Sequence, residues 1–260
     1  MAMRLAGLFA VIVGATAHGE VSFNESIEWD SDDNASDVLT TTTAPGGPAV
    51  PQLPMRCNST ERPLMSKCTG CPPMYKGKLC ASTTWYEDRT LGACGCGAPG
   101  SKYVDDDFWT LTSWTAALNT VNLDPVHPEK GWCPSGCGQC FELCTTGGIT
   151  NTDISIAPAG QCKVFKIANR CSDGWIVDKP EWCSQRLTWQ ECVADPEKCQ
   201  QRRSTNMFGY PAHFDLQDAH RQIQSVLGWD NPEVTFEPVS CDLWEGPKEA
   251  ECAACKVTWP

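Results

Sequence analysis

Residues 83–88, Thr-Thr-Trp-Tyr-Glu-Asp, have the alternation of polar and aromatic side chains that is typical of a β-strand reaching the protein surface. Alternation sends Thr84 and Tyr86 to one face of such a strand and Trp85 to the other. Asp88 then falls at the mouth of the strand. We therefore expect a carboxylate at this strand end, where an ordinary acidic surface turn is the alternative.

A second alternating stretch, His213-Phe214-Asp215-Leu216, predicts another strand. Phe214 and Leu216 face the core, while His213 and Asp215 face a polar cleft. Desolvation against aromatic walls helps an Asp to keep its proton, as a general acid near neutral pH requires. Two carboxylates on separate elements, one protonated and one ionised, are sufficient to cleave a glycosidic bond by general acid and base catalysis.

Further short strand candidates are separated by loops rich in Gly and Cys. Together with the two stretches above, the candidates are 82–86, 139–144, 162–168, 213–216, 234–239 and 254–259. This spacing predicts a mainly β fold, a compact barrel formed by one domain over residues 81–260. Helical periodicity is confined to residues 107–118 and 216–227, where we expect short helices.

The amino-terminal region has the composition of targeting and linker segments. Residues 1–17 have a basic start, a short apolar run and a small-residue site, which predicts a signal peptide and a secreted protein. Residues 18–56 are acidic and then rich in Thr and Pro, which predicts a disordered linker. Asn24, Asn34 and Asn58 occupy Asn-x-Ser/Thr sequons, so glycosylation is expected there.

The chain has eighteen cysteines, an even number that suits disulfides in an oxidising compartment. Three Cys-x-x-Cys spacings suggest zinc as an alternative, but secretion favours disulfide bonding, and we expect no metal and no cofactor. Residues 57–80 hold four of the cysteines in a span too short for its own core. We expect a Cys-rich extension of the main domain, with a small carbohydrate-binding knot as the alternative.

The formal net charge of −12 argues against nucleic acid or an anionic membrane as a partner. A neutral polymer is compatible with this charge. The chain also has eleven tryptophans, and exposed indoles bind the apolar faces of sugars, although most tryptophans are core residues. Five of them lie near the key motifs: Trp85, Trp109, Trp132, Trp175 and Trp182.

Five ordered blocks resemble glycoside hydrolase family 45, the endo-β-1,4-glucanases related to expansins. The resemblance covers most of the chain from Thr83 to Cys255, particularly in the branch with the Gly-Ala-Cys-Gly-Cys-Gly motif. The blocks are residues 83–97, 132–143, 167–171 (Ile-Ala-Asn-Arg-Cys), 205–216 (Thr-Asn-Met-Phe-Gly-Tyr-Pro-Ala-His-Phe-Asp-Leu) and 236–241.

This resemblance implies a six-stranded double-psi β-barrel and an inverting hydrolase of β-1,4-glucan. We expect a monomer, although the sequence itself leaves the oligomeric state open. Asp88 would be the general base and Asp215 the general acid, about 6.5 to 9.5 Å apart so that water fits between base and sugar. The residues implied in substrate binding are Thr84, Trp85, Tyr86, Trp132, Asn169, Trp182 and His213.

Two other functions are alternatives to a hydrolase. A non-hydrolytic, wall-loosening protein of the expansin kind shares the barrel, but expansins lack the first-strand Asp that stands here as Asp88. A structural extracellular protein would owe its motifs to disulfides alone. In that case substitution of Asp88 or Asp215 would change stability and nothing else.

Overall fold

The computed structural model describes residues 57, 65–87, 92–96, 113–150, 157–172, 182–201, 203–246 and 255. The segments expected as signal peptide and linker, 1–17 and 18–56, lie outside these residues, as do the three sequons. Asp88 and, apart from Cys255, the strand expected at 254–259 lie outside them as well.

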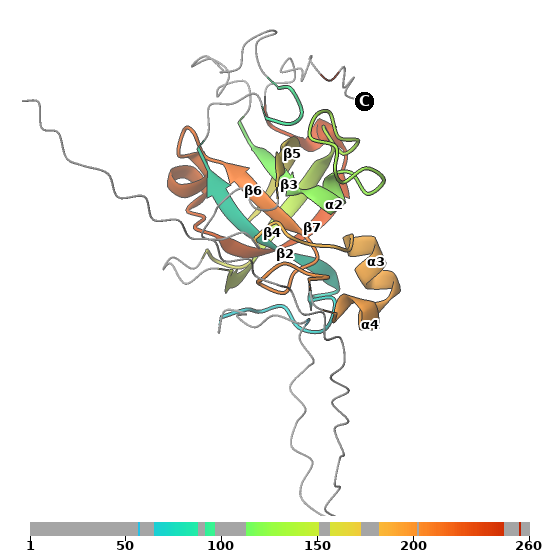
Figure 1. Cartoon of the computed structure of the whole chain (residues 1–260). Helices are drawn as coiled ribbons and strands as arrows, with labels where there is room; N and C mark the ends of the chain where they lie inside the picture. The colour runs from blue at the N-terminus through green and yellow to red at the C-terminus, as the bar shows by residue number, and fades with distance from the viewer. Residues whose placement is uncertain are drawn as a thin grey trace, which may run out of the picture. The chain divides into compact units, whose positions relative to one another are not determined.

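Six strands form a closed ring (Figure 1). The order is β2-β6-β3-β5-β4-β7, and β7 pairs back with β2. β1 is added to β2 as an antiparallel edge strand. The strands are β1 (Met74–Tyr75), β2 (Lys78–Tyr86), β3 (Thr115–Asn119), β4 (Cys140–Ile149), β5 (Cys162–Cys171), β6 (His213–Gln217) and β7 (Pro232–Val239). The predicted six-stranded double-psi barrel is confirmed.

Two parallel pairs, β2 with β6 and β3 with β5, lie side by side and are joined by the antiparallel pair β3–β6. The interior of the ring is filled by aromatic and aliphatic side chains in edge-to-face and tilted contacts. Its largest members are Leu118, Phe141, Leu143, Phe165, Ile167, Trp189, Phe214, Leu216, Trp229 and Phe236. Phe214 and Leu216 therefore face the core, as the alternation predicted.

Both predicted helices were wrong in part. Residues 115–118 belong to β3, whose five residues are all buried. A strand covered on both faces shows no alternation, so its apolar residues mimicked a helical period. In the second predicted helix, 216–227, Leu216 and Gln217 belong to β6 instead. Only Gln222–Leu227 is helical, and it forms the π-helix η1. The Asp218 carboxylate accepts a hydrogen bond from Ile223 N (2.7 Å) at the start of η1.

The remaining helices are short: α2 (Thr120–Leu123), α3 (Trp189–Ala194), α4 (Pro196–Cys199) and the 3-10 helix η2 (Cys241–Leu243). α3 begins with a capping box, in which the Thr188 side chain accepts from Glu191 N and the Glu191 carboxylate accepts from Thr188 N. Within the described part of the chain, the helices are too short or too polar to cross a membrane.

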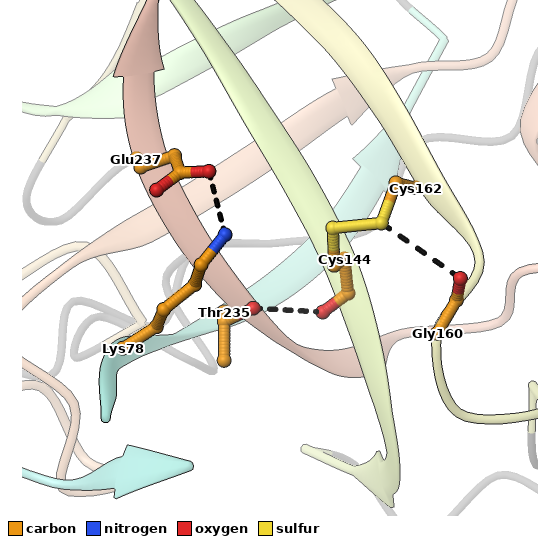
Figure 2. A network of polar contacts seen from close by, with 6 residues as sticks. All are labelled: Lys78, Cys144, Gly160, Cys162, Thr235 and Glu237. Atoms are coloured by element: carbon orange, nitrogen blue, oxygen red, sulfur yellow. Dashed lines mark hydrogen bonds and ion pairs between the residues drawn. A yellow bond between two sulfur atoms is a disulfide. The ribbon is translucent and has the colours of Figure 1, made fainter. Parts of the chain in front are cut away.

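Disulfides join the loops to the barrel. The described pairs are 57–71, 68–80, 94–137, 133–255, 140–241, 144–162, 171–183 and 192–199. Cys68, Cys71, Cys137, Cys140 and Cys255 from the Cys-x-x-Cys spacings are disulfide-bonded, each to a distant cysteine. Figure 2 shows Cys144–Cys162 across β4 and β5, beside the ion pair of Lys78 with Glu237 (2.5 Å) that links β2 to β7.

Candidate active site

Four residues on four adjacent strands form one row on the outside of the barrel. Thr84 of β2 pairs with Asp215 of β6, Asp215 pairs with Ala117 of β3, and Ala117 pairs with Asn169 of β5. Directly paired residues project from the same face of a sheet. We call this surface, defined by Thr84, Asp215, Ala117 and Asn169, the polar face.

A β-bulge places Asn169 in this row. Ala116 pairs with Ile167, but the next residue, Ala117, pairs with Asn169, so Ala168 is an extra residue in β5. Ile167 faces the core. If β5 paired without the bulge, Ala168 would stand beside Ala117 and Asn169 would point inward. The bulge therefore exposes a polar amide where strict alternation would have buried it.

The buried side chains behind Asp215 form a hydrogen-bonded chain. Thr84 Oγ1 lies 2.6 Å from Asp215 Oδ1 and 2.9 Å from His213 Nε2. His213 Nδ1 lies 2.8 Å from Ser82 Oγ, which accepts a hydrogen bond from Asn206 Nδ2 at 2.6 Å. Hydrogen bonds thus connect five residues from β2, β6 and the loop before β6, one after another, from Asn206 to Asp215.

All hydrogen bonds of this chain run in one direction. Burial lowers the pKa of His213 to about 3, so its ring is neutral at ordinary pH. The single Thr84 proton goes to Asp215, and so His213 Nε2–H must donate to Thr84 while Nδ1 accepts from Ser82. The network therefore assigns the tautomer of His213. It also places a donated hydrogen bond on Oδ1 of Asp215.

Sequence reasoning gave no role to Ser82 or Asn206. Ser82 could have been found, because it lies two residues before Thr84 and alternation puts both on one face of β2. Asn206 had no such signal, since it reaches Ser82 from a loop 124 residues away in the chain. Its carboxamide oxygen accepts from Phe208 N and Tyr210 N at 3.1 and 3.0 Å, so the orientation of the amide is fixed.

The loop at residues 92–96, which follows Asp88 in sequence, is fastened to the polar face. Ala93 N donates to Asn169 Oδ1 at 2.7 Å. Gly92 has φ +62° and approaches so closely that an added Cβ would lie 2.8 Å from Asn169 Cγ. The Cys94–Cys137 disulfide fixes the loop from its other side. Asn169 therefore holds a loop as well as standing in the row.

Trp132 lies next to this loop. Cys133 N donates to Ala93 O at 2.8 Å, and Arg170 Nη1 donates to Lys130 O at 3.3 Å, so the Trp132 segment is joined to both the loop and the end of β5. The Trp132 side chain is 48% exposed. A half-exposed indole beside the polar face has the geometry for stacking on a sugar ring.

The other predicted binding residues are placed differently. Trp85 is 37% exposed, but it pairs with core residue Leu216, so it projects from the opposite face of β2 to Thr84. Tyr86 is half-buried and shares the face of Thr84. Trp182 packs on Phe208, with ring centroids 6.1 Å apart, and its carbonyl accepts from Asn206 Nδ2. The structure thus joins Thr84, His213 and Asp215 by hydrogen bonds and places Asn169 in the same row beyond β3, whereas the Trp85 and Trp182 rings lie outside this row.

Comparison with known proteins gives consistent matches. A family model described as EXPB1-like domain 1 matches residues 81–246. The endoglucanase of Mytilus edulis is 40% identical over 177 residues, which cover 68% of this chain and 86% of the relative. Endoglucanase-5 of Hypocrea jecorina is 28% identical over 181 residues, covering 68% of this chain and 62% of the relative.

Solved structures agree. Beta-1,4-D-endoglucanase Cel45A from the blue mussel Mytilus edulis matches with a TM-score of 0.58 and 35% identity, covering 72% of this chain and 99% of that one. The GH45 endoglucanase EG27II in complex with cellobiose matches with a TM-score of 0.55 and 34% identity, covering 69% of this chain and 92% of that one.

The barrel, the buried chain ending at an Asp and these matches define a glycoside hydrolase with an expansin-like domain. Within that class, the chain belongs to family 45, the endoglucanases.

Proposed function

We propose that this endoglucanase cleaves internal β-1,4-glucosidic bonds with inversion, using Asp215 as general acid and Asp88 as general base. The single observation that supports this most strongly is the one-way hydrogen-bonded chain ending at Asp215 Oδ1. This chain supports the proposal because it holds the Asp215 carboxyl group in one orientation, and an acid catalyst must present its proton to the leaving oxygen in a fixed direction.

Asp88 is assigned as base from the sequence. It stands two residues beyond Tyr86, the last residue of β2, and Thr84 on the same strand contacts Asp215. In the proposed reaction, Asp215 protonates the departing glycosidic oxygen. Asp88 takes a proton from the water that attacks the anomeric carbon on the opposite side, so the released sugar has inverted configuration.

The glucan is proposed to lie along the polar face, held by residues on both sides of Asp215. Asn169 and Trp132 lie toward β5, and Tyr86 lies toward the end of β2. Trp85 projects from the opposite face of β2, so it is not proposed to hold the glucan on this face. A long polymer suits a row of residues that runs across several strands on the outside of a barrel. Trp182 is proposed as a more distant contact, since its ring already packs on Phe208.

We further propose that the enzyme is secreted and works as a monomer. The proposal is supported by the composition of residues 1–17, which is typical of a signal peptide, and by the disulfide bonding of every cysteine in the described part of the chain. Such a chain needs an oxidising compartment to reach this structure.

The test is hydrolysis of soluble carboxymethyl cellulose and lichenan, with the anomers of the products followed by proton NMR. We expect fresh α-anomer from the wild type and none from Asp88→Asn or Asp215→Asn. The exposed Glu237→Gln is the matched carboxylate control and should keep wild-type activity. A correctly folded wild type that binds glucan without releasing sugar would support the expansin-like alternative instead.

A further inference from the structure

We infer that Glu233 is a positioning residue for the general acid, and that it connects the Cys-rich segment Met65–Cys80 to Asp215 through Tyr210 and Asn206. This inference rests on the proposed role of Asp215.

Glu233 of β7 is a fully buried carboxylate, and five hydrogen-bond donors surround it. Ser66 Oγ, Lys67 N and Cys68 N approach it at 2.5, 2.8 and 3.1 Å from the Cys-rich segment. The other two donors are Thr146 Oγ1 of β4, at 2.6 Å, and the Tyr210 hydroxyl.

Among the described residues no Lys, Arg or His forms an ion pair with this carboxylate. Its charge is therefore balanced by hydrogen bonds alone, and each donor matters. Gly148 of β4 makes this arrangement possible. A Cβ at Gly148 would lie 2.7 Å from Glu233 Oε1 and 2.9 Å from Met65 O. The Cys-rich segment is thus fitted tightly against the barrel around the Glu233 carboxylate.

Tyr210 connects the Glu233 carboxyl group to Asn206 in the active site. Its side chain is fully buried beside Cys68, Cys80 and Phe208. Its hydroxyl donates to Glu233, while its main chain is held at both ends by Asn206: Tyr210 N donates to Asn206 Oδ1, and Asn206 N donates to Tyr210 O, each at 3.0 Å.

The planar amide of Asn206 links the two regions. Because Oδ1 is held by Tyr210 N and Phe208 N, Nδ2 must point the other way, where it donates to Ser82 Oγ. Ser82 accepts this bond and directs its own proton to His213 Nδ1, and the resulting tautomer of His213 agrees with donation from Thr84 to Asp215. A displaced Tyr210 would free the Asn206 amide to rotate. The donors and acceptors in the hydrogen bonds from Asn206 to Asp215 would then no longer be fixed.

The test compares Glu233→Gln and Tyr210→Phe in the full chain with two controls. Glu237→Gln is an exposed carboxylate on the same strand, and Tyr75→Phe removes a half-buried hydroxyl from the same Cys-rich segment. The rate of carboxymethyl cellulose hydrolysis is measured against pH, with kcat and KM separated.

We expect both test variants to lower kcat about fivefold or more, to leave KM within about twofold, and to move the alkaline limb of the pH profile by about half a pH unit. The controls should match the wild type. A lower melting temperature with an unchanged pH profile in both test variants would mean a merely structural role and would overturn the inference. If Glu233→Gln does not fold, Tyr210→Phe alone decides, because it keeps the buried ring.

Asp215→Asn in the same assay separates the two proposals. Loss of activity there, with unchanged pH profiles in Glu233→Gln and Tyr210→Phe, would leave the proposed function standing and remove this inference. Retained activity in Asp215→Asn would overturn both.

Discussion

Thr84 Oγ1 donates a hydrogen bond to Asp215 Oδ1 over 2.6 Å and accepts one from His213 Nε2 over 2.9 Å, so one hydroxyl connects the buried imidazole to the proposed acid. Thr84→Val keeps the shape of the side chain and removes that hydroxyl. We expect kcat to fall about 100-fold with little change in KM, because the acid loses the group that orients it. Steady-state kinetics on carboxymethyl cellulose would measure this.

Thr84→Ser is the matched control, since it restores the hydroxyl without the methyl group. It should recover most of the lost rate. Equal loss in the Val and Ser variants would show that packing of the methyl group, and not the hydrogen bond, is what Asp215 requires.

The burial of His213 should make stability depend on pH. Its pKa in the folded protein is about 3, whereas its ordinary value is 6.5, so the unfolded chain binds a proton in this window that the folded chain does not. The free energy of unfolding is therefore unaffected by this titration above pH 6.5. It falls as the pH decreases from 6.5 toward 3, with a slope of at most about 1.4 kcal/mol per pH unit. The free energy of unfolding, measured from pH 4 to 7, would show this slope.

His213→Gln isolates the effect, because glutamine does not titrate. The variant should be less stable at pH 7, yet its stability should fall less steeply with acid than that of the wild type. Parallel curves for the two proteins would mean that His213 is protonated in the folded state.

Gly92→Ala tests the attachment of the loop to Asn169. The new Cβ would stand 2.8 Å from Asn169 Cγ, and the backbone already has φ +62°, which alanine adopts only with strain. We expect kcat/KM to fall about tenfold or more through displacement of the loop. Gly131→Ala is the control, because its added Cβ would lie 3.9 Å from Arg170 Nη2, which is an ordinary van der Waals distance, and the variant should behave as wild type.

Trp132→Ala tests sugar stacking. The side chain is 48% exposed, so its removal should leave the melting temperature almost unchanged. KM for the polymer should rise about three- to tenfold while kcat is preserved. Val126→Ala, on the same loop and 75% exposed, should change neither quantity. A fall in kcat alone would assign Trp132 to the shape of the loop and not to substrate.

Most of the barrel could be predicted from the sequence, because alternation is strong where one face of a strand is polar. The stretch 213–216 is the clearest case: Phe214 and Leu216 lie in the core, and Asp215 projects outward. β3 could not be found in the same way. It is buried on both faces, and its consecutive residues Ala-Ala-Leu interrupt any alternation of polar and apolar side chains.

For the candidate site, Thr84, His213 and Asp215 were predicted together, and they are joined by hydrogen bonds. Asn206 and Glu233 were missed as members because both act across large sequence separations, on Ser82 and on Ser66. No local pattern records which buried amide or carboxylate will meet which distant hydroxyl. That information exists only once the chain has folded.

The extra residue Ala168 reverses which residues of β5 face the core and which face outward. Up to Ile167 the strand follows one assignment of inside and outside, and from Asn169 onward it follows the opposite one. If the same sequence paired without the bulge, every functional residue would still be present, yet Ala168 would stand opposite Ala117, and the Asn169 amide would turn inward and lose its hold on Ala93. In β5, the pairing register therefore determines the role of Asn169 as much as the identity of the residue does.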